Sequence, residues 1–169
     1  MGDRDAEFGE YVDSRLTLMR RTAFLLGGGD WHAAEDLVQT ALTKLYTAWP
    51  RLRQDGAVDA YVRTVLVRTV IDESRRPWRK RERSVDEPPE VSVPAARVDD
   101  VLDVRRALRQ LPAGQRAVVV LRYWEDLSIT ETAKVLGRSE GTVKSQAAKG
   151  LAALRDLLAA GRTLVEEER

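Results

Sequence analysis

The chain has 169 residues, of which 43% are hydrophobic and 33% are charged, a composition that suits one ordinary domain or two small ones and excludes a disordered tail. It contains no cysteine, which excludes disulfides, zinc–thiolate sites and cysteine nucleophiles and fits a reducing cytoplasm. The acidic N-terminal residues predict no signal peptide, and no apolar run approaches the roughly 18 residues of a membrane span, so we expect a soluble chain.

The net charge of +1 conceals a strong segregation of charge along the chain. Residues 61–83 carry eight basic and three acidic side chains, residues 84–103 carry one basic and six acidic, and residues 104–160 carry ten basic and five acidic. Two basic blocks joined by an acidic connector indicate two separate contacts with a polyanion. For the C-terminal block alone, charges that only keep helices soluble explain the pattern equally well.

Apolar residues recur at helical spacing from the N-terminus onward. A stripe from Phe8 to Leu26 predicts a first helix that ends at three glycines, residues 27–29. Asp30 is the expected N-cap of a second helix, because its carboxylate can accept hydrogen bonds from the first free amides. We expect this second helix to end near Trp49.

A loop and a third helix are expected next. Pro50 and Gly56 bracket the predicted loop, which covers residues 50–59. The third helix is predicted over about residues 59–76, and Pro77 breaks it. Because this helix is apolar nearly all round, we expect it to be the central helix of its bundle.

Residues 84–100 contain three prolines, an acidic bias and no periodicity, which predicts an extended linker. We expect helices around residues 101–111 and 115–124 after it. The run VVVL, residues 118–121, fits a buried strand when taken by itself. With helical patterns on both sides and no partner strand, we interpret it as helical.

The C-terminal part carries the spacing of a helix-turn-helix. Ser128 and Glu131 form a predicted capping box at the start of a short helix. Gly137 is expected to end that helix and Ser139 to cap the next one.

The second of these helices has an outer face of small and polar residues that is almost free of acid. Small residues let a helix backbone approach a major groove closely, and the polar ones supply donors for bases and phosphates. The face therefore favours DNA binding, and a solvated face with ordinary lysines is the alternative.

Catalytic and metal chemistry have little support in the sequence. His32 is the only histidine and is interpreted as a surface residue, and no acids stand at ligand spacing from it. The glycines at 27–29 follow no strand and precede no lysine at phosphate-loop spacing. We therefore predict no enzyme activity, no cofactor and no metal.

Three stretches resemble the extracytoplasmic-function (group IV) sigma factors of bacterial RNA polymerase, of the actinobacterial SigE-like type. They are AEDLVQTALTKLYTAW at residues 34–49, AYVRTVLVRTVIDESRR at residues 60–76, and LPAGQRAVVVLRYWEDLSITETAKVLGRSEGTVKS at residues 111–145. The first two are similar to the family's second region, which docks on the polymerase clamp and opens the −10 element. The third is similar to its fourth region, which binds the −35 element.

The resemblance implies roles for residues of the N-terminal part. Asp36 of the DLVQ motif is expected to pair with basic groups of the polymerase clamp, together with Gln39 and Thr43 on the same helix face. The segment 50–59 corresponds to the loop that captures a flipped base. The residues expected to contact −10 DNA are Arg51, Arg53, Gln54, Asp55, Tyr61, Arg63, Arg75, Arg76 and Arg79.

For the C-terminal part, the resemblance implies contact with −35 DNA. The expected residues are Arg138, Ser139, Thr142, Lys144, Ser145, Gln146, Ala148 and Lys149. The family pattern SRxxR is replaced here by SQAAK, residues 145–149, which removes the bidentate guanine contacts of arginine. The −35 preference is therefore expected to differ from that of better-known members.

The sequence thus predicts an all-α chain of two small helical domains, an N-terminal helical bundle and a C-terminal helix-turn-helix domain, joined by an acidic, proline-containing linker. The predicted limits are 1–82 for the first domain, 83–100 for the linker, 101–160 for the second domain and 161–169 for a polar tail. The expected partners are core RNA polymerase (beta-prime clamp and beta flap), promoter DNA and an anti-sigma factor, in the cytoplasm, with a monomer when free. The alternative function is a stand-alone helix-turn-helix transcriptional regulator.

Overall fold

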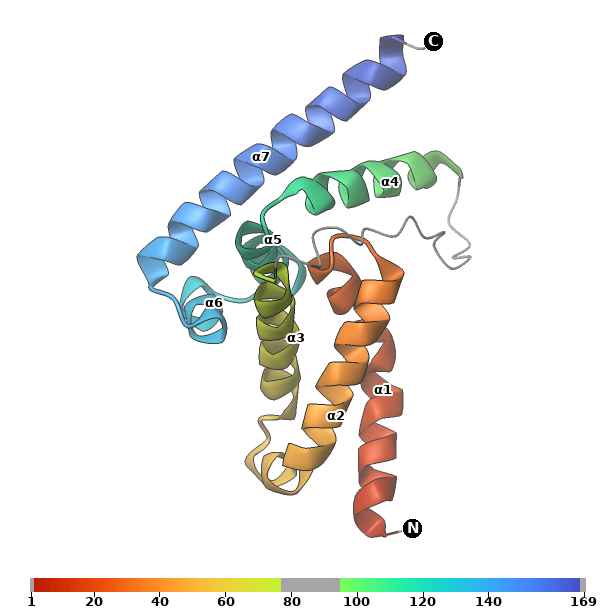
Figure 1. Cartoon of the computed structure of the whole chain (residues 1–169), viewed down its shortest axis with the longest axis vertical. Helices are drawn as coiled ribbons and strands as arrows, with labels where there is room; N and C mark the ends of the chain where they lie inside the picture. The colour runs from red at the N-terminus through yellow and green to blue at the C-terminus, as the bar shows by residue number, and fades with distance from the viewer. Residues whose placement is uncertain (1, 77–94, 168–169) are drawn as a thin grey trace.

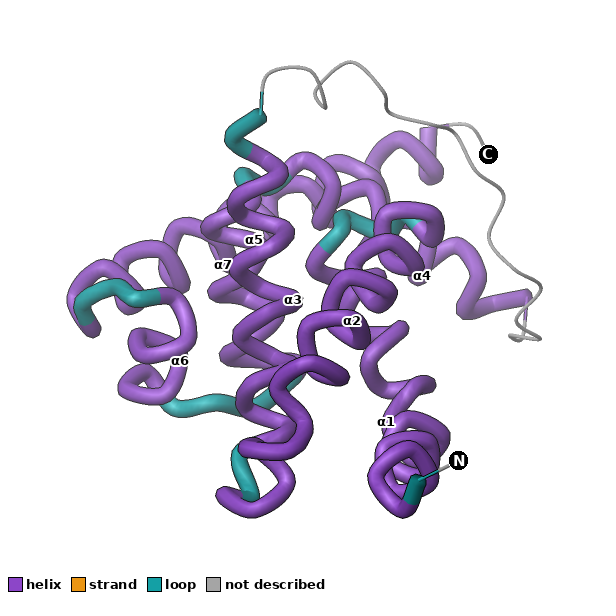
Figure 2. The backbone as a smooth tube through the Cα atoms, turned by 60° about the horizontal axis from the view of Figure 1, so that its bottom comes forward, coloured by secondary structure: helices purple, strands orange, loops and turns teal. Residues whose placement is uncertain are grey.

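The structure is a computed structural model, which describes residues 2–76 and 95–167, and the side chains of 2–76 and 102–161. Within these ranges every regular element is a helix, which confirms the all-α fold class (Figure 2). The N-terminal half consists of α1 (Asp3–Leu26), α2 (Trp31–Asp55) and α3 (Val58–Ser74). The C-terminal half consists of α4 (Ala95–Gln110), α5 (Ala113–Val119), the π-helical turn η2 (Val120–Trp124), α6 (Ile129–Leu136) and α7 (Glu140–Glu167). No helix in the described ranges is both long and apolar enough to cross a bilayer.

The three helices of the N-terminal half lie side by side and share one apolar core (Figure 1). Leu37, Leu45 and Leu66 are at most 2% exposed, as expected for side chains on the predicted stripes. At the far end of the bundle, Phe8 packs edge-on against Trp49 with ring centroids 5.4 Å apart. This aromatic contact fixes the start of α1 against the last third of α2.

The N-cap predicted at Asp30 is confirmed. Its carboxylate accepts hydrogen bonds from the amides of His32 and Ala33 at 2.9 and 3.2 Å, which satisfies two donors of the first turn of α2. The glycines before it let α1 and α2 reverse direction within a few residues, because Gly28 and Gly29 have φ angles of 73° and 79°.

The loop predicted at residues 50–59 is wrong in most of its length. Helix α2 continues through Pro50 to Asp55, and Gly56 ends it in the left-handed conformation. Leu52 explains the continuation, because its side chain is 6% exposed and anchors the added turn in the core. Proline loses one backbone hydrogen bond at this position, and burial of Leu52 offsets that loss.

The central position predicted for α3 within its own bundle is also wrong. Helix α2 packs along both α1 and α3, whereas α1 and α3 make a smaller contact (Figures 1 and 2). Helix α3 lies instead between α2 and the C-terminal half, where it contacts α5 and α6. The nearly all-round apolar character of α3 therefore reflects two apolar neighbours on opposite sides.

Two boundaries of the C-terminal half differ from the sequence expectation. Helix α4 begins at Ala95, six residues before the predicted start, because good helix formers follow directly after the last proline of the acidic segment. Helix α7 continues to Glu167 instead of ending before a polar tail at 161–169. The sequence after Gly161 contains no helix-breaking residue before that point.

The helix-turn-helix is formed by α6 and α7, and its predicted local signals are confirmed. The Ser128 hydroxyl accepts from the Glu131 amide at 3.0 Å, and the Glu131 carboxylate accepts from the Ser128 amide at 2.7 Å. Gly137 ends α6 with a φ of 62°, and the Ser139 hydroxyl accepts from the Thr142 amide at 3.1 Å. These caps set the angle at which α7 leaves the turn.

The VVVL run is helical, as expected, and it passes from α5 into a π-helical turn. The Glu125 amide donates to the Val120 carbonyl at 3.0 Å, five residues back. This wider turn keeps Leu121 fully buried while Tyr123 and Trp124 are 54% and 47% exposed. It also directs Glu125 toward the N-terminal half.

Candidate protein and nucleic-acid interfaces

The outer face of α2 presents the residues expected to contact a protein partner. Asp36, Gln39 and Thr43 are all exposed and follow one another at the spacing of a single helix face. The Thr43 hydroxyl donates to the backbone carbonyl of Gln39 at 2.9 Å, one turn back along the helix. The structure therefore brings these three residues together on an accessible surface.

The end of α2 and the start of α3 enclose a surface cavity of about 450 Å³. Arg51 and Tyr61, both expected to contact single-stranded DNA, line it together with Thr43, Lys44 and Thr47. An aromatic ring and a guanidinium beside an open cavity are suited to stacking on a base. Because Thr43 also belongs to the α2 face, this cavity adjoins the expected protein-binding surface.

The other residues of the segment 50–59 that were expected to contact DNA do not line this cavity. Arg53 forms an ion pair with Glu7 of α1, so its charge is held on a different side of α2. Gln54 and Asp55 are exposed in the last turn of the helix. Because the segment is helical, Arg51 and Arg53 lie on different sides of α2. A loop would have allowed both side chains to reach the same cavity.

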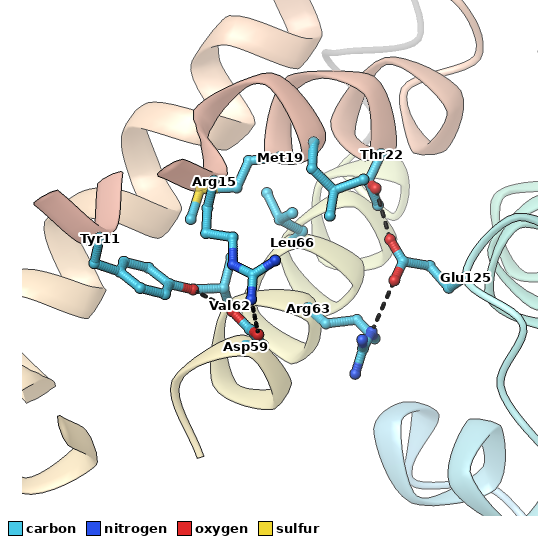
Figure 3. Close-up of a pocket in the computed structure, with 10 residues that line it drawn as sticks. Tyr11, Arg15, Met19, Thr22, Asp59, Val62, Arg63, Leu66 and Glu125 are labelled. Carbon is cyan, nitrogen blue, oxygen red and sulfur yellow. Dashed lines mark hydrogen bonds and ion pairs between the residues drawn. The ribbon is translucent and has the colours of Figure 1, made fainter. Parts of the chain in front are cut away.

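Arg63 is turned toward the C-terminal half. Its Nε donates to Glu125 Oε2 at 3.2 Å, and the other carboxylate oxygen of Glu125 accepts from the Thr22 hydroxyl at 2.6 Å (Figure 3). These groups line a pocket between α1 and α3 in which Arg15 and Asp59 form a second ion pair, at 3.1 Å. Arg63 is therefore only partly accessible, with 25% of its side chain exposed.

A third cavity, called here the junction cavity, lies where α3 meets the C-terminal half. Residues from both halves line it: Arg68, Ile71, Asp72, Ser74, Arg75, Ala113, Gly114, Leu136, Gly137, Arg138 and Gln146. It contains Arg75 from the expected −10 set and Arg138 and Gln146 from the expected −35 set. Arg76 is exposed beside it, and Arg79 lies outside the described residues.

Helix α7 has the two faces that the sequence predicts. Val143 and Ala147 are buried against Val118 and Ala133. Gly150 allows α7 to cross α5 closely, since an added Cβ there would lie 2.8 Å from a methyl group of Val119. The recognition helix is thus held against α5 by small residues.

The opposite face of α7 and the turn before it carry the expected DNA-binding residues. Arg138 and Ser139 in the turn and Lys144, Ser145, Ala148 and Lys149 on α7 are exposed, and Thr142 and Gln146 are half-buried. No acid occurs between Gly141 and Arg155, so this face repels no phosphate. Arg138 and Gln146 differ from the rest because both line the junction cavity, and the Gln146 side chain also lies close to Gly114 of α5.

Hydrogen bonding around the first turn of α6 perturbs one acid. Two hydrogen bonds with Ser128 lower the pKa of Glu131, because both stabilise its carboxylate form. The backbone amide of Ser128 has the larger effect and its hydroxyl the smaller one. The hydroxyl of Thr130 donates to Glu140 at 2.8 Å and ties α6 to the first turn of α7.

In the described part of the chain, His and acidic side chains form no group of three that could hold a metal ion.

Several residues that join the two halves carried no functional prediction. Glu125 reaches α1 and α3, and Arg105, Arg109 and Arg116 donate to backbone carbonyls at the end of α1 or in the turn that follows. The sequence contains one signal that could have predicted these contacts, namely the three glycines at residues 27–29, because consecutive glycines permit the close approach of another segment.

Two family models match the chain. Residues 11–80 match the model described as Sigma-70 region 2, and residues 102–154 match the model described as Sigma-70, region 4. The first match contains the α2 face and the cavity at Tyr61, and the second contains the helix-turn-helix.

Similar proteins cover nearly the whole chain. The RNA polymerase sigma-E factor of Streptomyces coelicolor is 39% identical over 96% of this chain and 94% of its own length. The ECF RNA polymerase sigma factor SigM of Mycobacterium tuberculosis is 34% identical over 74% of this chain and 64% of its own length. Among solved structures, the sigma factor RpoE in complex with the anti-sigma factor NepR from Bartonella quintana has a TM-score of 0.71 and 24% identity, covering 90% of this chain and 97% of that one. That likeness concerns the fold.

Proposed function

The chain belongs to the extracytoplasmic-function group of the sigma-70 family, and we propose that it binds core RNA polymerase and uses its two halves on separate promoter elements. It is a sigma factor that directs promoter-specific transcription initiation. The observation that carries this conclusion is the similarity to sigma factors along 96% of the chain, which includes both matched regions in the family's order. The sigma-70 family is not an enzyme family, and we propose no catalytic activity for this member.

The stand-alone regulator is the weaker reading of the same helix-turn-helix. It explains the C-terminal half and leaves the region 2 match at residues 11–80 without a role. The exposed α2 face and the cavity at Arg51 and Tyr61 are features that a simple duplex-binding regulator does not need.

The C-terminal half is proposed to bind the −35 duplex through α7. Lys144, Ser145 and Lys149 are exposed on the acid-free face, where they can reach phosphates and base edges of a major groove. Ala148 lies between them and permits close approach of the backbone. The capped turn before α7 fixes the angle of entry.

The N-terminal half is proposed to hold the opened −10 strand. The cavity lined by Arg51 and Tyr61 offers stacking for an unpaired base, and Arg75 and Arg76 at the end of α3 offer charge for phosphates. Asp36, with Gln39 and Thr43, is proposed to bind basic groups of the polymerase clamp.

We propose a cytoplasmic location, since transcription takes place there, and a monomeric free protein. A sequestering anti-sigma factor is proposed as a further partner. The domain limits remain a proposal as well, namely 1–82 and 101–160, with the second domain extended at its start to include all of α4.

In vitro transcription tests the function directly. Purified chain and core polymerase without any other sigma factor are incubated with genomic fragments of the source bacterium, and transcript start sites are mapped. Discrete starts that require the chain and share upstream sequence motifs are expected. Binding of the chain to the same fragments without any polymerase-dependent starts would favour the regulator reading.

A further inference from the structure

Helix α2 runs through a proline, and that proline leaves one backbone acceptor without its helical donor. Pro50 has no N–H, so it cannot donate to the Tyr46 carbonyl four residues back, as any other residue at this position would. The Tyr46 carbonyl nevertheless has a partner, because Nη2 of Arg4 donates to it at 3.0 Å. A side chain from the first turn of α1 therefore supplies the hydrogen bond that the proline removes.

The side chain of Tyr46 is held by the same turn of α1. The Arg4 guanidinium lies over the Tyr46 ring, 4.8 Å from its centroid, and the Tyr46 hydroxyl donates to the Asp5 carboxylate at 2.9 Å. The hydrogen bond to Asp5, and then the charge of that carboxylate, raise the pKa of Tyr46, because both favour the neutral phenol. Since 43% of Tyr46 is exposed, these contacts rather than burial hold it in place.

Two further contacts join the start of α1 to α2, one on each side of the proline. Before it, the Phe8 ring packs edge-on against the Tyr46 ring with centroids 5.1 Å apart. Three residues after it, Arg53 forms an ion pair with Glu7. The start of α1 and the end of α2 accordingly lie at the same end of the N-terminal bundle (Figure 1). The residues of α1 that make these contacts are called here the α1 clasp: Arg4, Asp5, Glu7 and Phe8.

The clasped segment of α2 forms one wall of the cavity proposed for an unpaired base. Thr47, Ala48, Pro50 and Arg51 line this cavity together with Tyr61 of α3. Arg51 follows the proline directly, so its position relative to Tyr61 depends on whether the turn at Pro50 stays helical. A helix that opened at the proline would bend there and carry the Arg51 side chain away from the tyrosine ring.

We propose that Arg4 completes α2 at Pro50, and that the α1 clasp thereby holds Arg51 where it can stack on an unpaired base beside Tyr61. Arg4 is then a positioning residue for the opened −10 strand, although it does not itself line the cavity. The clasp also accounts for the helix found at a segment whose proline and glycine predict a loop. This inference rests on the proposed function of the cavity.

The proline itself allows the donor role of Arg4 to be separated from general packing. Arg4→Ala removes the donor, whereas Pro50→Ala restores a backbone N–H for the Tyr46 carbonyl, so a chain with Pro50→Ala should no longer need Arg4. Arg20→Ala is the matched control, because it breaks a different exposed contact between α1 and α2, the ion pair with Glu35 at 3.0 Å. The four chains to compare with wild type are therefore the three single variants and Arg4→Ala combined with Pro50→Ala.

Amide hydrogen exchange of the free chain measures the local effect without polymerase or DNA. Peptides that cover residues 47–56 are followed by mass spectrometry. We expect these amides to exchange about tenfold faster in Arg4→Ala than in wild type or Arg20→Ala, because the turn at the proline opens more often. In the Pro50→Ala background, Arg4→Ala should cause no acceleration. An unchanged rate in Arg4→Ala, or the same acceleration in both backgrounds, would overturn the proposal.

DNA binding by the chain in complex with core polymerase measures the functional effect. The probes are a labelled single strand with the −10 sequence of the promoters found by transcript mapping, and the −35 duplex of the same promoters. If loss of Arg4 leaves Arg51 correctly placed in about one molecule in ten, the apparent Kd for the single strand rises about tenfold. The Kd for the −35 duplex should stay unchanged, and Arg20→Ala should alter neither value.

The two DNA probes and the control variant decide between positioning and general destabilisation. Equal losses on both probes, or a loss in Arg20→Ala as large as that in Arg4→Ala, would overturn the positioning role. A loss that persists in the Pro50→Ala background would overturn it as well. A wild-type complex that binds neither probe, while Arg4→Ala still accelerates exchange in the free chain, would instead reject the proposed function and leave the local role of Arg4 in α2 intact.

Discussion

Replacing Glu125 by glutamine tests the energetic contribution of the bridge between the halves. The carboxylate accepts from Thr22 at 2.6 Å and from Arg63 at 3.2 Å, and only 13% of the Glu125 side chain and 25% of the Arg63 side chain are exposed. The amide oxygen of glutamine can keep the hydrogen bond from Thr22. Its amide nitrogen would then face the Arg63 guanidinium, so one donor is set against another.

The expected magnitude follows from burial. Exposed ion pairs contribute about 0–1 kcal/mol, whereas removing one partner of a fully buried pair costs about 3–5 kcal/mol. The Arg63–Glu125 pair lies between these limits, so we expect a loss of roughly 2 kcal/mol in the free energy of unfolding. With a urea m-value of about 2 kcal/mol/M, the midpoint falls by about 1 M.

Urea denaturation followed by circular dichroism measures this change, and Glu35→Gln is the matched control. Glu35 pairs with Arg20 at 3.0 Å, but 44% and 46% of the two side chains are exposed. The control should therefore lose no more than about 0.5 kcal/mol. Equal midpoints for the two variants would refute the claim that Glu125 stabilises the junction.

Three further predictions concern the proposed DNA surfaces and the helix-turn-helix. Ser145→Ala and Lys149→Ala should each weaken binding of the cognate −35 duplex by about 1–3 kcal/mol in fluorescence anisotropy; equal losses on every sequence would show that only phosphates are contacted. Tyr61→Ala should weaken binding of −10 single-stranded DNA by about 1–3 kcal/mol, and an unchanged Kd would exclude stacking in the cavity. Ser128→Ala should cost about 1 kcal/mol of stability at neutral pH. Because the folded chain lowers the pKa of Glu131, the capping contribution is present above the ordinary glutamate pKa of about 4.3 and is lost as the pH falls through the folded value. The Ser128 hydroxyl also accepts from the Glu131 amide at 3.0 Å, and this hydrogen bond does not titrate, so the difference between wild type and Ser128→Ala should narrow in acid without vanishing. Equal stabilities at neutral pH would contradict the cap.

Local signals in the sequence predicted the local structure well. Asp30, the Ser128–Glu131 capping box and Gly137 each act on residues within one turn, so their effects do not depend on the rest of the fold. The helical interpretation of VVVL also holds, because neighbouring helices supply its burial. The exposed face of α7 could be predicted for the same reason, because the helical repeat alone places Val143 and Ser145 on different faces of the helix.

Predictions that depended on distant contacts were the ones that failed or were missing. Pro50 and Gly56 suggested a loop, but burial of Leu52 against the core extends α2 past the proline. The apolar surface of α3 suggested a bundle centre, whereas part of it packs against α5 and α6 of the C-terminal half. Glu125 and Arg105 carry no local motif, and only the folded arrangement shows which carbonyls and cations they meet.

Association with core RNA polymerase tests the central claim most directly. Wild-type chain, Asp36→Arg and the control Asp13→Arg, a charge reversal at an exposed position of α1, are mixed with core enzyme lacking sigma and separated by size-exclusion chromatography. We predict stoichiometric co-elution of the wild type and of Asp13→Arg, and loss of co-elution for Asp36→Arg with its helix content unchanged. Failure of the wild-type chain to co-elute with core polymerase would contradict the sigma-factor account.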